Sequence, residues 1–139
     1  MSVDYKIKGK VAIVTGSSSG MGKASAERLA SQGVNLVMVS RNQNKLDEAA
    51  NEIRLLHKVE VLSHAGDVGD PSLPQKVIDL AEEKWGRCDI LVNNSGGPPM
   101  GSFLEQNDET WATAINNNLM STIRFSTCAS RAMLKNNWG

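Results

Sequence analysis

A glycine-rich segment, Thr15–Gly22 (TGSSSGMG), contains residues that could bind a phosphate group. It directly follows the apolar run Val11–Val14, which is typical of a buried strand. Glycine tolerates positive φ and lets a ligand approach the main chain closely. A helix that begins at the end of such a turn directs its free N–H groups and positive end toward it, which suits a pyrophosphate. The segment indicates a phosphate-binding turn. A glycine-rich turn alone is a weak indication, so other residues of the chain must support this interpretation.

Three further polar segments follow other apolar runs and could complete a binding site. They are Ser40–Arg41, Asp67–Val68 and Asn93–Gly96. Each of them alone is also compatible with an ordinary turn or an exposed loop. The three segments indicate a binding site only if the fold brings them together.

Strand and helix patterns alternate along the whole chain and position these segments. The predicted strands are Lys10–Thr15, Val34–Ser40, Val59–Ala65 and Asp89–Asn93. The first predicted helix is Gly22–Ser31, and the second follows the cap residue Asn42 with an apolar stripe from Leu46 to Leu56. The third begins with the cap residue Asp70 and Pro71 and ends at Gly86. A short helix and then a long one are predicted between about Asn107 and Asn136.

Strands that alternate with helices in this way imply right-handed βαβ units and a parallel sheet. We therefore predict an α/β fold with a doubly wound, Rossmann-type parallel sheet. In such a sheet, ligands bind outside the carboxyl ends of the strands, near the point where the strand order reverses. All four polar segments follow strand ends, so we expect them to converge on one site.

Composition excludes several other classes of protein. The formal net charge is zero, so no basic excess favours nucleic acid or an anionic membrane surface. No apolar run approaches the roughly 20 residues of a membrane span. Cys88 and Cys128 form neither a disulfide framework nor a metal-ligand spacing, and we predict no metal site. The polar N-terminus lacks the apolar core of a signal peptide, and we expect a cytoplasmic protein.

The order of these motifs resembles the short-chain dehydrogenase/reductase family, in particular its 3-oxoacyl-carrier-protein reductases. The matching pieces are TGSSSGMG at Thr15–Gly22, Asp67–Val68, NNSG at Asn93–Gly96, and an Asn–Leu pair seven residues after Trp111, which selects Asn118. The resemblance covers essentially the whole chain. It implies an oxidoreductase that transfers a hydride between a nicotinamide cofactor and a small carbonyl or alcohol substrate.

The resemblance also implies roles for individual residues. The pyrophosphate turn would be formed by Gly16, Ser17, Ser18, Ser19, Gly20, Met21 and Gly22. Asp67 would contact the adenine amino group and Val68 would add a backbone contact, while Asn94 would lie beside the adenosine ribose. Gly96 would also belong to the cofactor-binding residues. Asn118 would hold a water molecule in the family's proton relay. Ser95 stands where the family usually has alanine.

Cofactor choice depends on the end of the second predicted strand. A carboxylate there would bind the 2′-hydroxyl of NAD and repel the 2′-phosphate of NADP. This chain has Ser40 and Arg41 instead, and a guanidinium pairs well with a phosphate. We therefore expect NADP rather than NAD. Many NADP-preferring members carry a second basic residue in the turn, where this chain has Ser19.

The family's proton donor, a Tyr-x-x-x-Lys pair, and its catalytic serine do not occur among these residues. The single tyrosine is Tyr5, and Asn118 alone represents the catalytic set. We expect residues 1–139 to be the N-terminal half of one reductase domain, with four strands of an expected seven, ending before strand five. The intact protein would be an oligomer, and this chain alone would be inactive. The alternatives are a non-catalytic dinucleotide-binding module and a fragment that binds no cofactor.

Overall fold

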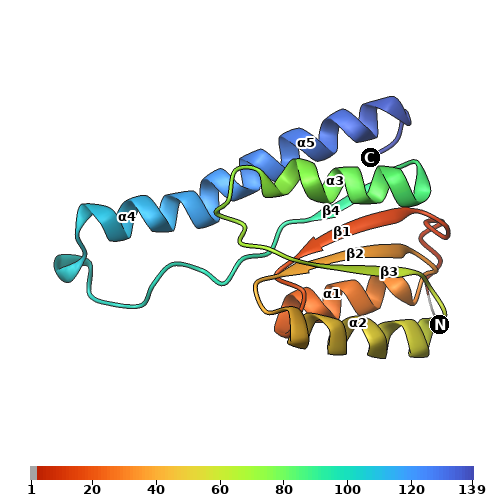
Figure 1. The fold of residues 1–139 in the computed structure, drawn as a ribbon, viewed down its shortest axis with the longest axis horizontal. Helices are drawn as coiled ribbons and strands as arrows, with labels where there is room; N and C mark the ends of the chain where they lie inside the picture. The colour runs from red at the N-terminus through yellow and green to blue at the C-terminus, as the bar shows by residue number, and fades with distance from the viewer. Residues whose placement is uncertain (1–2) are drawn as a thin grey trace.

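The computed structural model describes residues 3–139, which fold around one parallel sheet (Figure 1). The four strands are β1 (Val11–Thr15), β2 (Asn35–Ser40), β3 (Val61–Ala65) and β4 (Ile90–Val92). Their order in the sheet is β3-β2-β1-β4, and every neighbouring pair is parallel. The predicted doubly wound α/β fold is confirmed. Because β4 returns to the far side of β1, the strand order reverses between these two strands.

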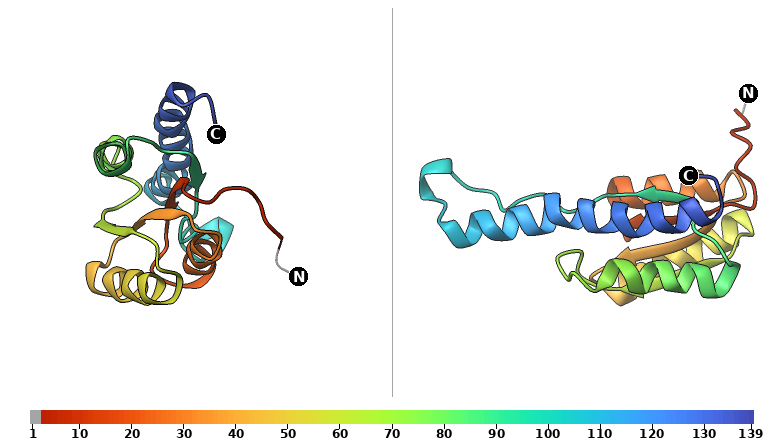
Figure 2. Two further views of the ribbon diagram at one scale, coloured as in Figure 1. Left: turned by 90° about the vertical axis from the view of Figure 1, so that its right-hand side faces the viewer. Right: turned by 90° about the horizontal axis from the view of Figure 1, so that it is seen from above.

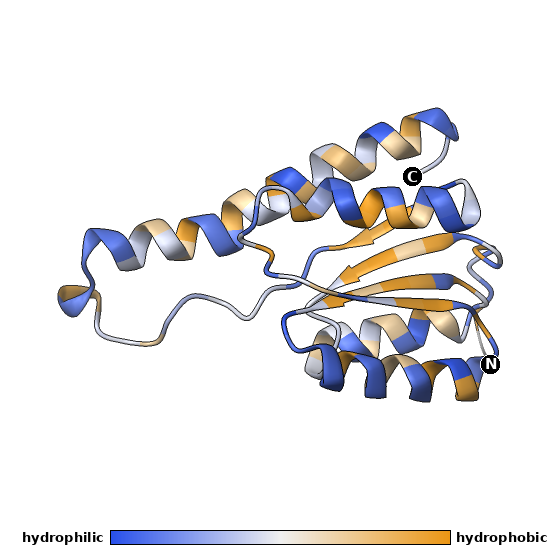
Figure 3. Ribbon diagram, viewed as in Figure 1, coloured by the Kyte–Doolittle hydropathy of each residue, from blue (hydrophilic) through white to orange (hydrophobic). Residues whose placement is uncertain are grey.

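The helices cover both faces of the sheet, as the views in Figures 1 and 2 agree. On one face lie α1 (Gly20–Ala30) and α2 (Gln43–His57). On the other face lie α3 (Leu73–Trp85) and α5 (Ser121–Lys135). Figure 3 shows that the hydrophobic residues are concentrated in the strands between these two helical layers. This arrangement explains why β1 and the middle of β2 are apolar.

Alternate residues of β1 supply the two halves of the core. Val11 and Ile13 are fully buried against α3 and α5, together with Phe125. Ala12 and Val14 are fully buried on the opposite face against α1 and α2. Successive side chains of a strand point to opposite faces, so a central strand with four consecutive apolar residues must be covered on both sides.

Asp89 fixes the beginning of β1 to the segment before β4. Its buried carboxylate accepts a hydrogen bond from the Val11 amide and two from Arg87, both of the latter 2.7 Å long. Lys10 lies 3.8 Å away. Burial alone would raise the pKa of Asp89, but the hydrogen bonds and the nearby positive charges outweigh it and lower the pKa below its ordinary value. The ionised carboxylate therefore stabilises this edge of the fold.

Three local predictions were wrong. The first helix begins at Gly20 rather than at Gly22 and ends at Ala30 rather than at Ser31. The third helix begins at Leu73 rather than at Pro71, and its N-cap is Ser72. The Asp70 carboxylate binds the amide and the hydroxyl of Ser72, which forms a turn ahead of the helix. Leu56 is 66% exposed, so the buried face of α2 does not extend to it.

The last part of the chain forms one long helical arm. It consists of the short 3-10 turn η1 (Phe103–Glu105), then α4 (Asp108–Ile115), a π-helical turn η2 (Asn116–Met120), and α5. Figure 1 shows α4 and the preceding loop extending well beyond the sheet. The predicted short and long helices are thus joined without a break, through a π turn that places one extra residue between them.

Candidate cofactor-binding site

The glycine-rich turn connects β1 to α1 and is anchored to its neighbours. The buried Ser17 hydroxyl accepts a hydrogen bond from the Val39 amide at 3.0 Å and lies 3.3 Å from the Val39 carbonyl. Ser19, the N-cap of α1, makes no side-chain cap hydrogen bond, and the first turn of α1 carries no acidic residue. The free N–H groups at this helix end are therefore available to an anion.

Asn94 closes the other side of the turn. Its Nδ2 donates to the Gly16 carbonyl at 3.1 Å, and its main chain exchanges two 2.9 Å hydrogen bonds with the Thr15 hydroxyl. Gly16 has φ +60°, and a Cβ there would lie 2.6 Å from Asn94 Nδ2. A Cβ at Gly22 would overlap the Gly16 carbonyl. These two positions require glycine because backbone and amide occupy the space of a side chain.

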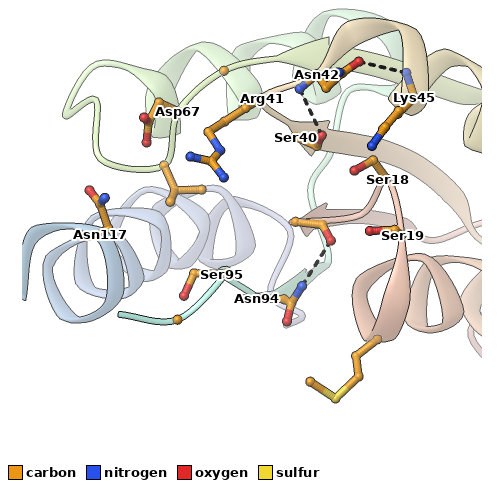
Figure 4. Close-up of a pocket in the computed structure, with 16 residues that line it drawn as sticks. Ser18, Ser19, Ser40, Arg41, Asn42, Lys45, Asp67, Asn94, Ser95 and Asn117 are labelled. Atoms are coloured by element: carbon orange, nitrogen blue, oxygen red, sulfur yellow. Dashed lines mark hydrogen bonds between the residues drawn. The ribbon is translucent and has the colours of Figure 1, made fainter. Parts of the chain in front are cut away.

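A cleft of about 480 Å³ opens at the carboxyl ends of the strands, beside the point where the strand order reverses (Figure 4). The predicted residues that line it are Gly16, Ser18, Ser19, Met21, Ser40, Arg41, Asp67, Val68, Asn94 and Gly96. Ser17, Gly20 and Gly22 do not line it. Ser17 and Gly22 instead support the turn from behind, and Gly20 (φ +56°) begins α1.

Two cations lie at the β2 side of the cleft. Arg41 follows β2, and Lys45 stands in the first turn of α2. In Figure 4 the Lys45 ammonium is directed toward Ser18, and the Arg41 guanidinium extends into the pocket. A cation in the first turn of a helix opposes the helix dipole, so helix stability does not explain Lys45. This conflict is the signal in the sequence that could have identified Lys45 as a site residue.

Asp67 presents a carboxylate on an exposed turn after β3, beside Arg41 in Figure 4. One of its oxygens accepts a 2.8 Å hydrogen bond from the Gly69 amide, which holds the side chain in place. The cleft therefore carries two cations after β2 and a carboxylate acceptor after the neighbouring strand β3. These groups suit a ligand that has both a phosphate and a hydrogen-bond donor.

Asn118 lies in the π turn, behind the cleft wall rather than in the wall itself. Its Oδ1 accepts a 2.8 Å hydrogen bond from the hydroxyl of Ser95, and its Nδ2 donates to the Ala114 carbonyl. Ser95 in turn lines the cleft. Ser95 thus contacts the asparagine that the sequence predicts for the proton relay.

Several residues of the cleft wall had no individual cofactor contact predicted from the sequence. They are Asn42, Lys45, Gly66, Ser95, Gly97 and Asn117. Most of them adjoin residues that were predicted, but Asn117 comes from the helical arm. No cluster of three or more His, Cys, Asp or Glu side chains suited to a metal ion occurs within residues 3–139. In the same part of the chain, no helix is long and apolar enough to cross a membrane.

Comparison with known proteins identifies the family. The family model "short chain dehydrogenase" matches residues 10–139. The chain belongs to the short-chain dehydrogenase/reductase family. It is 39% identical over 107 residues to dehydrogenase/reductase SDR family member 4 of Caenorhabditis elegans, which covers 76% of this chain and 41% of that protein. It is 33% identical to the 3-oxoacyl-[acyl-carrier-protein] reductase FabG of Escherichia coli, over 95% of this chain and 52% of that one.

Solved structures of this family have the same architecture. L-sorbose reductase from Gluconobacter frateurii, solved with NADPH and L-sorbose, superposes with a TM-score of 0.89 at 37% identity, over 94% of this chain and 50% of that one. A xylitol dehydrogenase with bound NAD⁺ gives a TM-score of 0.88 at 26% identity, over 96% of this chain and 52% of that one. The chain therefore spans about half the length of these family members. The family is an oxidoreductase family that uses nicotinamide cofactors.

Proposed function

We propose that this chain binds NADP(H) in the cleft and forms the cofactor-binding part of a carbonyl reductase or alcohol dehydrogenase. The observation that supports this best is the pair of cations, Arg41 and Lys45, at the end of the cleft beyond β2. An adenosine ribose beside Asn94 would direct its 2′-phosphate toward them, with the hydroxyls of Ser18 and Ser40 nearby. A guanidinium and an ammonium neutralise a phosphate, whereas they gain little from a 2′-hydroxyl.

The glycine turn fits the pyrophosphate of the same cofactor. Gly16 leaves no space for a side chain, and the uncapped N-terminus of α1 offers main-chain N–H groups. Asp67, on the turn after β3, would accept from the adenine amino group. When bound, the nicotinamide would supply or accept the hydride. Asn118 would serve the proton relay from behind the cleft, held by Ser95.

Binding measurements test this proposal directly. NADPH and NADH would be titrated into the chain while the fluorescence of its three tryptophans is followed. We expect NADPH to bind at least about tenfold more tightly, since each charge-assisted hydrogen bond contributes substantially. Equal Kd values would contradict the preference for NADP. Binding of neither cofactor would contradict the proposal as a whole.

A non-catalytic dinucleotide-binding module is the second candidate. The observation that favours it is the absence of a Tyr-x-x-x-Lys pair within these 139 residues, whose one tyrosine is Tyr5. We propose that this chain by itself binds the cofactor without turnover. NADPH oxidation assayed with a panel of aldehydes and ketones separates the candidates. Turnover by this chain would exclude the module.

We also propose that the protein with a complete reductase domain is a homo-oligomer. A row of apolar side chains, four residues apart, stays exposed along the helical arm: Trp111, Ile115, Leu119 and Ile123, each at least 44% exposed. A continuous exposed apolar row of this kind indicates a protein interface. Light scattering after size exclusion tests this proposal. A monomer at micromolar concentration would contradict it.

A further inference from the structure

The side chains of the three consecutive asparagines of the π turn have different surroundings. Asn116 binds the Gly69 carbonyl, Asn117 lines the cleft, and Asn118 binds Ser95. Of the three, only Asn117 has a polar group directed into the cleft without a defined task. What that group is depends on which way its amide is turned.

The orientation of Asn116 is fixed by its two partners. Its Nδ2 lies 3.0 Å from the Gly69 carbonyl, and its Oδ1 lies 2.8 Å from Arg124 Nη1. A carbonyl can only accept a hydrogen bond and a guanidinium can only donate one. The reverse orientation of the Asn116 amide would place two acceptors together and two donors together.

The orientation of Asn116 then determines that of Asn117. Asn116 Nδ2 also faces the Asn117 amide at 3.3 Å, so the Asn117 atom that it meets must be the acceptor Oδ1. That oxygen is packed closely against Gly69, where a Cβ would collide with it. The Asn117 Nδ2 group is consequently turned away from Gly69. Within residues 3–139 it makes no hydrogen bond, so both of its N–H donors are available to the cleft.

This donor lies on the side of the cleft that carries Asp67. Figure 4 shows Asn117 directed toward the side of the pocket that carries Asp67. The pair therefore offers a carboxylate acceptor and an amide donor from two separate elements, the turn after β3 and the π turn. Adenine has the complementary pattern, an N6 amino donor next to ring-nitrogen acceptors, and asparagine is a common partner of that edge.

We propose that Asn117 is a specificity-determining residue that recognises the adenine base by donating a hydrogen bond from Nδ2 to a ring nitrogen beside the amino group. Asn116 and Arg124 are positioning residues, because they set the orientation of the Asn117 amide. The inference rests on the proposed function and adds to it the residue that, with Asp67, distinguishes adenine from bases that lack this donor and acceptor pattern.

The test uses ¹⁵N-labelled chain and adenosine 2′,5′-bisphosphate as the probe. We expect the side-chain NH₂ signals of Asn117, assigned with the Asn117→Leu variant, to shift downfield on saturation, while those of Asn116 move less. Asn117→Leu should weaken binding of the probe by about three- to tenfold, the effect of one hydrogen bond. The matched control Lys45→Met should also weaken binding, but its Asn117 signals should still shift at saturation.

The outcomes separate this inference from the proposed function. Shifts of the Asn117 NH₂ signals with a weaker Asn117→Leu complex support it. Shifts confined to the glycine turn, with Asn117 unmoved, overturn the role of Asn117 and leave cofactor binding intact. No shift in any signal at millimolar probe overturns both. Asn117→Asp keeps the Oδ1 acceptor toward Asn116, so it serves where the leucine variant fails to fold; it should bind the probe more weakly.

Discussion

The hydroxyl of Ser95 donates a 2.8 Å hydrogen bond to Oδ1 of Asn118, which joins the loop after β4 to the π turn of the helical arm. The two residues are 23 positions apart in the chain. Together they connect the wall of the cleft to the asparagine that we propose for the proton relay. A substitution that breaks this hydrogen bond should therefore affect both the cleft wall and Asn118.

Ser95→Ala, the residue typical of the family, should lower the free energy of unfolding by about 1 kcal/mol, because it leaves the half-buried Asn118 oxygen without its donor. Urea unfolding of the variant and the parent measures the difference. The exposed Ser130 on α5 provides the control, and Ser130→Ala should change stability by less than about 0.5 kcal/mol. Equal effects of the two changes would contradict a role for the Ser95 bond.

Lys45→Met should change binding and stability in opposite directions. We expect NADPH to bind about tenfold more weakly with NADH nearly unaffected, because the 2′-phosphate loses one of its two cations. The free energy of unfolding should rise by about 0.3–1 kcal/mol, since a charge that opposes the α2 dipole is removed. Calorimetric titration and thermal unfolding measure the two effects. A loss of stability together with equal weakening for both cofactors would contradict this assignment.

Gly16→Ala should abolish cofactor binding and lower the free energy of unfolding by about 2 kcal/mol or more. The added Cβ would require an unfavourable φ and would lie 2.7 Å from the Asn94 carbonyl oxygen. Gly20→Ala is the matched control, because Gly20 also has positive φ but has open space around its Cβ position. Gly20→Ala should introduce the backbone strain of positive φ without steric overlap, and it should therefore be less destabilising than Gly16→Ala. Two equal losses in urea unfolding would show that steric overlap with Asn94 contributes nothing.

Stability should fall on acidification, partly through Asp89. Its pKa is lower in the folded chain than its ordinary value, so its contribution is present above about pH 4 and is lost as the pH falls through the folded-state pKa. Asp89→Asn should cost about 2 kcal/mol at pH 7 and progressively less toward pH 2. Urea unfolding of both proteins across this pH range measures the difference. A constant difference would rule out ionised Asp89 as the source.

The two cysteines should differ in reactivity. Burial raises the pKa of the Cys88 thiol to about 12, with a further contribution from the carboxylates of Asp89 and Glu82, so almost no thiolate forms at pH 8. Cys128 is half-buried. Ellman's reagent at pH 8 should modify Cys128 in the native chain and both thiols in guanidinium chloride. If the folded Cys128→Ser variant still reacted rapidly with Ellman's reagent, this would contradict the burial of Cys88.

The sheet was predictable because its strands are short apolar runs that end in polar or glycine residues. The core positions Val11 to Val14 follow directly from this pattern, and strand ends differed by one or two residues. The start of α3 was less predictable, because Asp70 and Ser72 are both good cap residues and only their mutual hydrogen bonds decide between them. Leu56 was misassigned because His57 takes the next half-buried position on α2.

The glycine turn and its partners were predictable because they are local motifs that follow strand ends. Asn117 was not, since its position depends on Gly69, which is far away in the chain and meets it only after the arm has folded over the sheet. Lys45 could have been found from the sequence, as an unfavourable charge in a capped first turn.

The π turn has a consequence for how this site could vary. An α-helix rotates by 100° per residue, so the one residue that widens η2 sets the direction in which everything before it faces relative to α5. Deleting a single asparagine from the run would restore a regular helix and turn α4 by about that angle. The loss of one codon would then exchange the partners of the remaining asparagines and turn Trp111 and Ile115 relative to Leu119 and Ile123, altering the cleft and the proposed interface together.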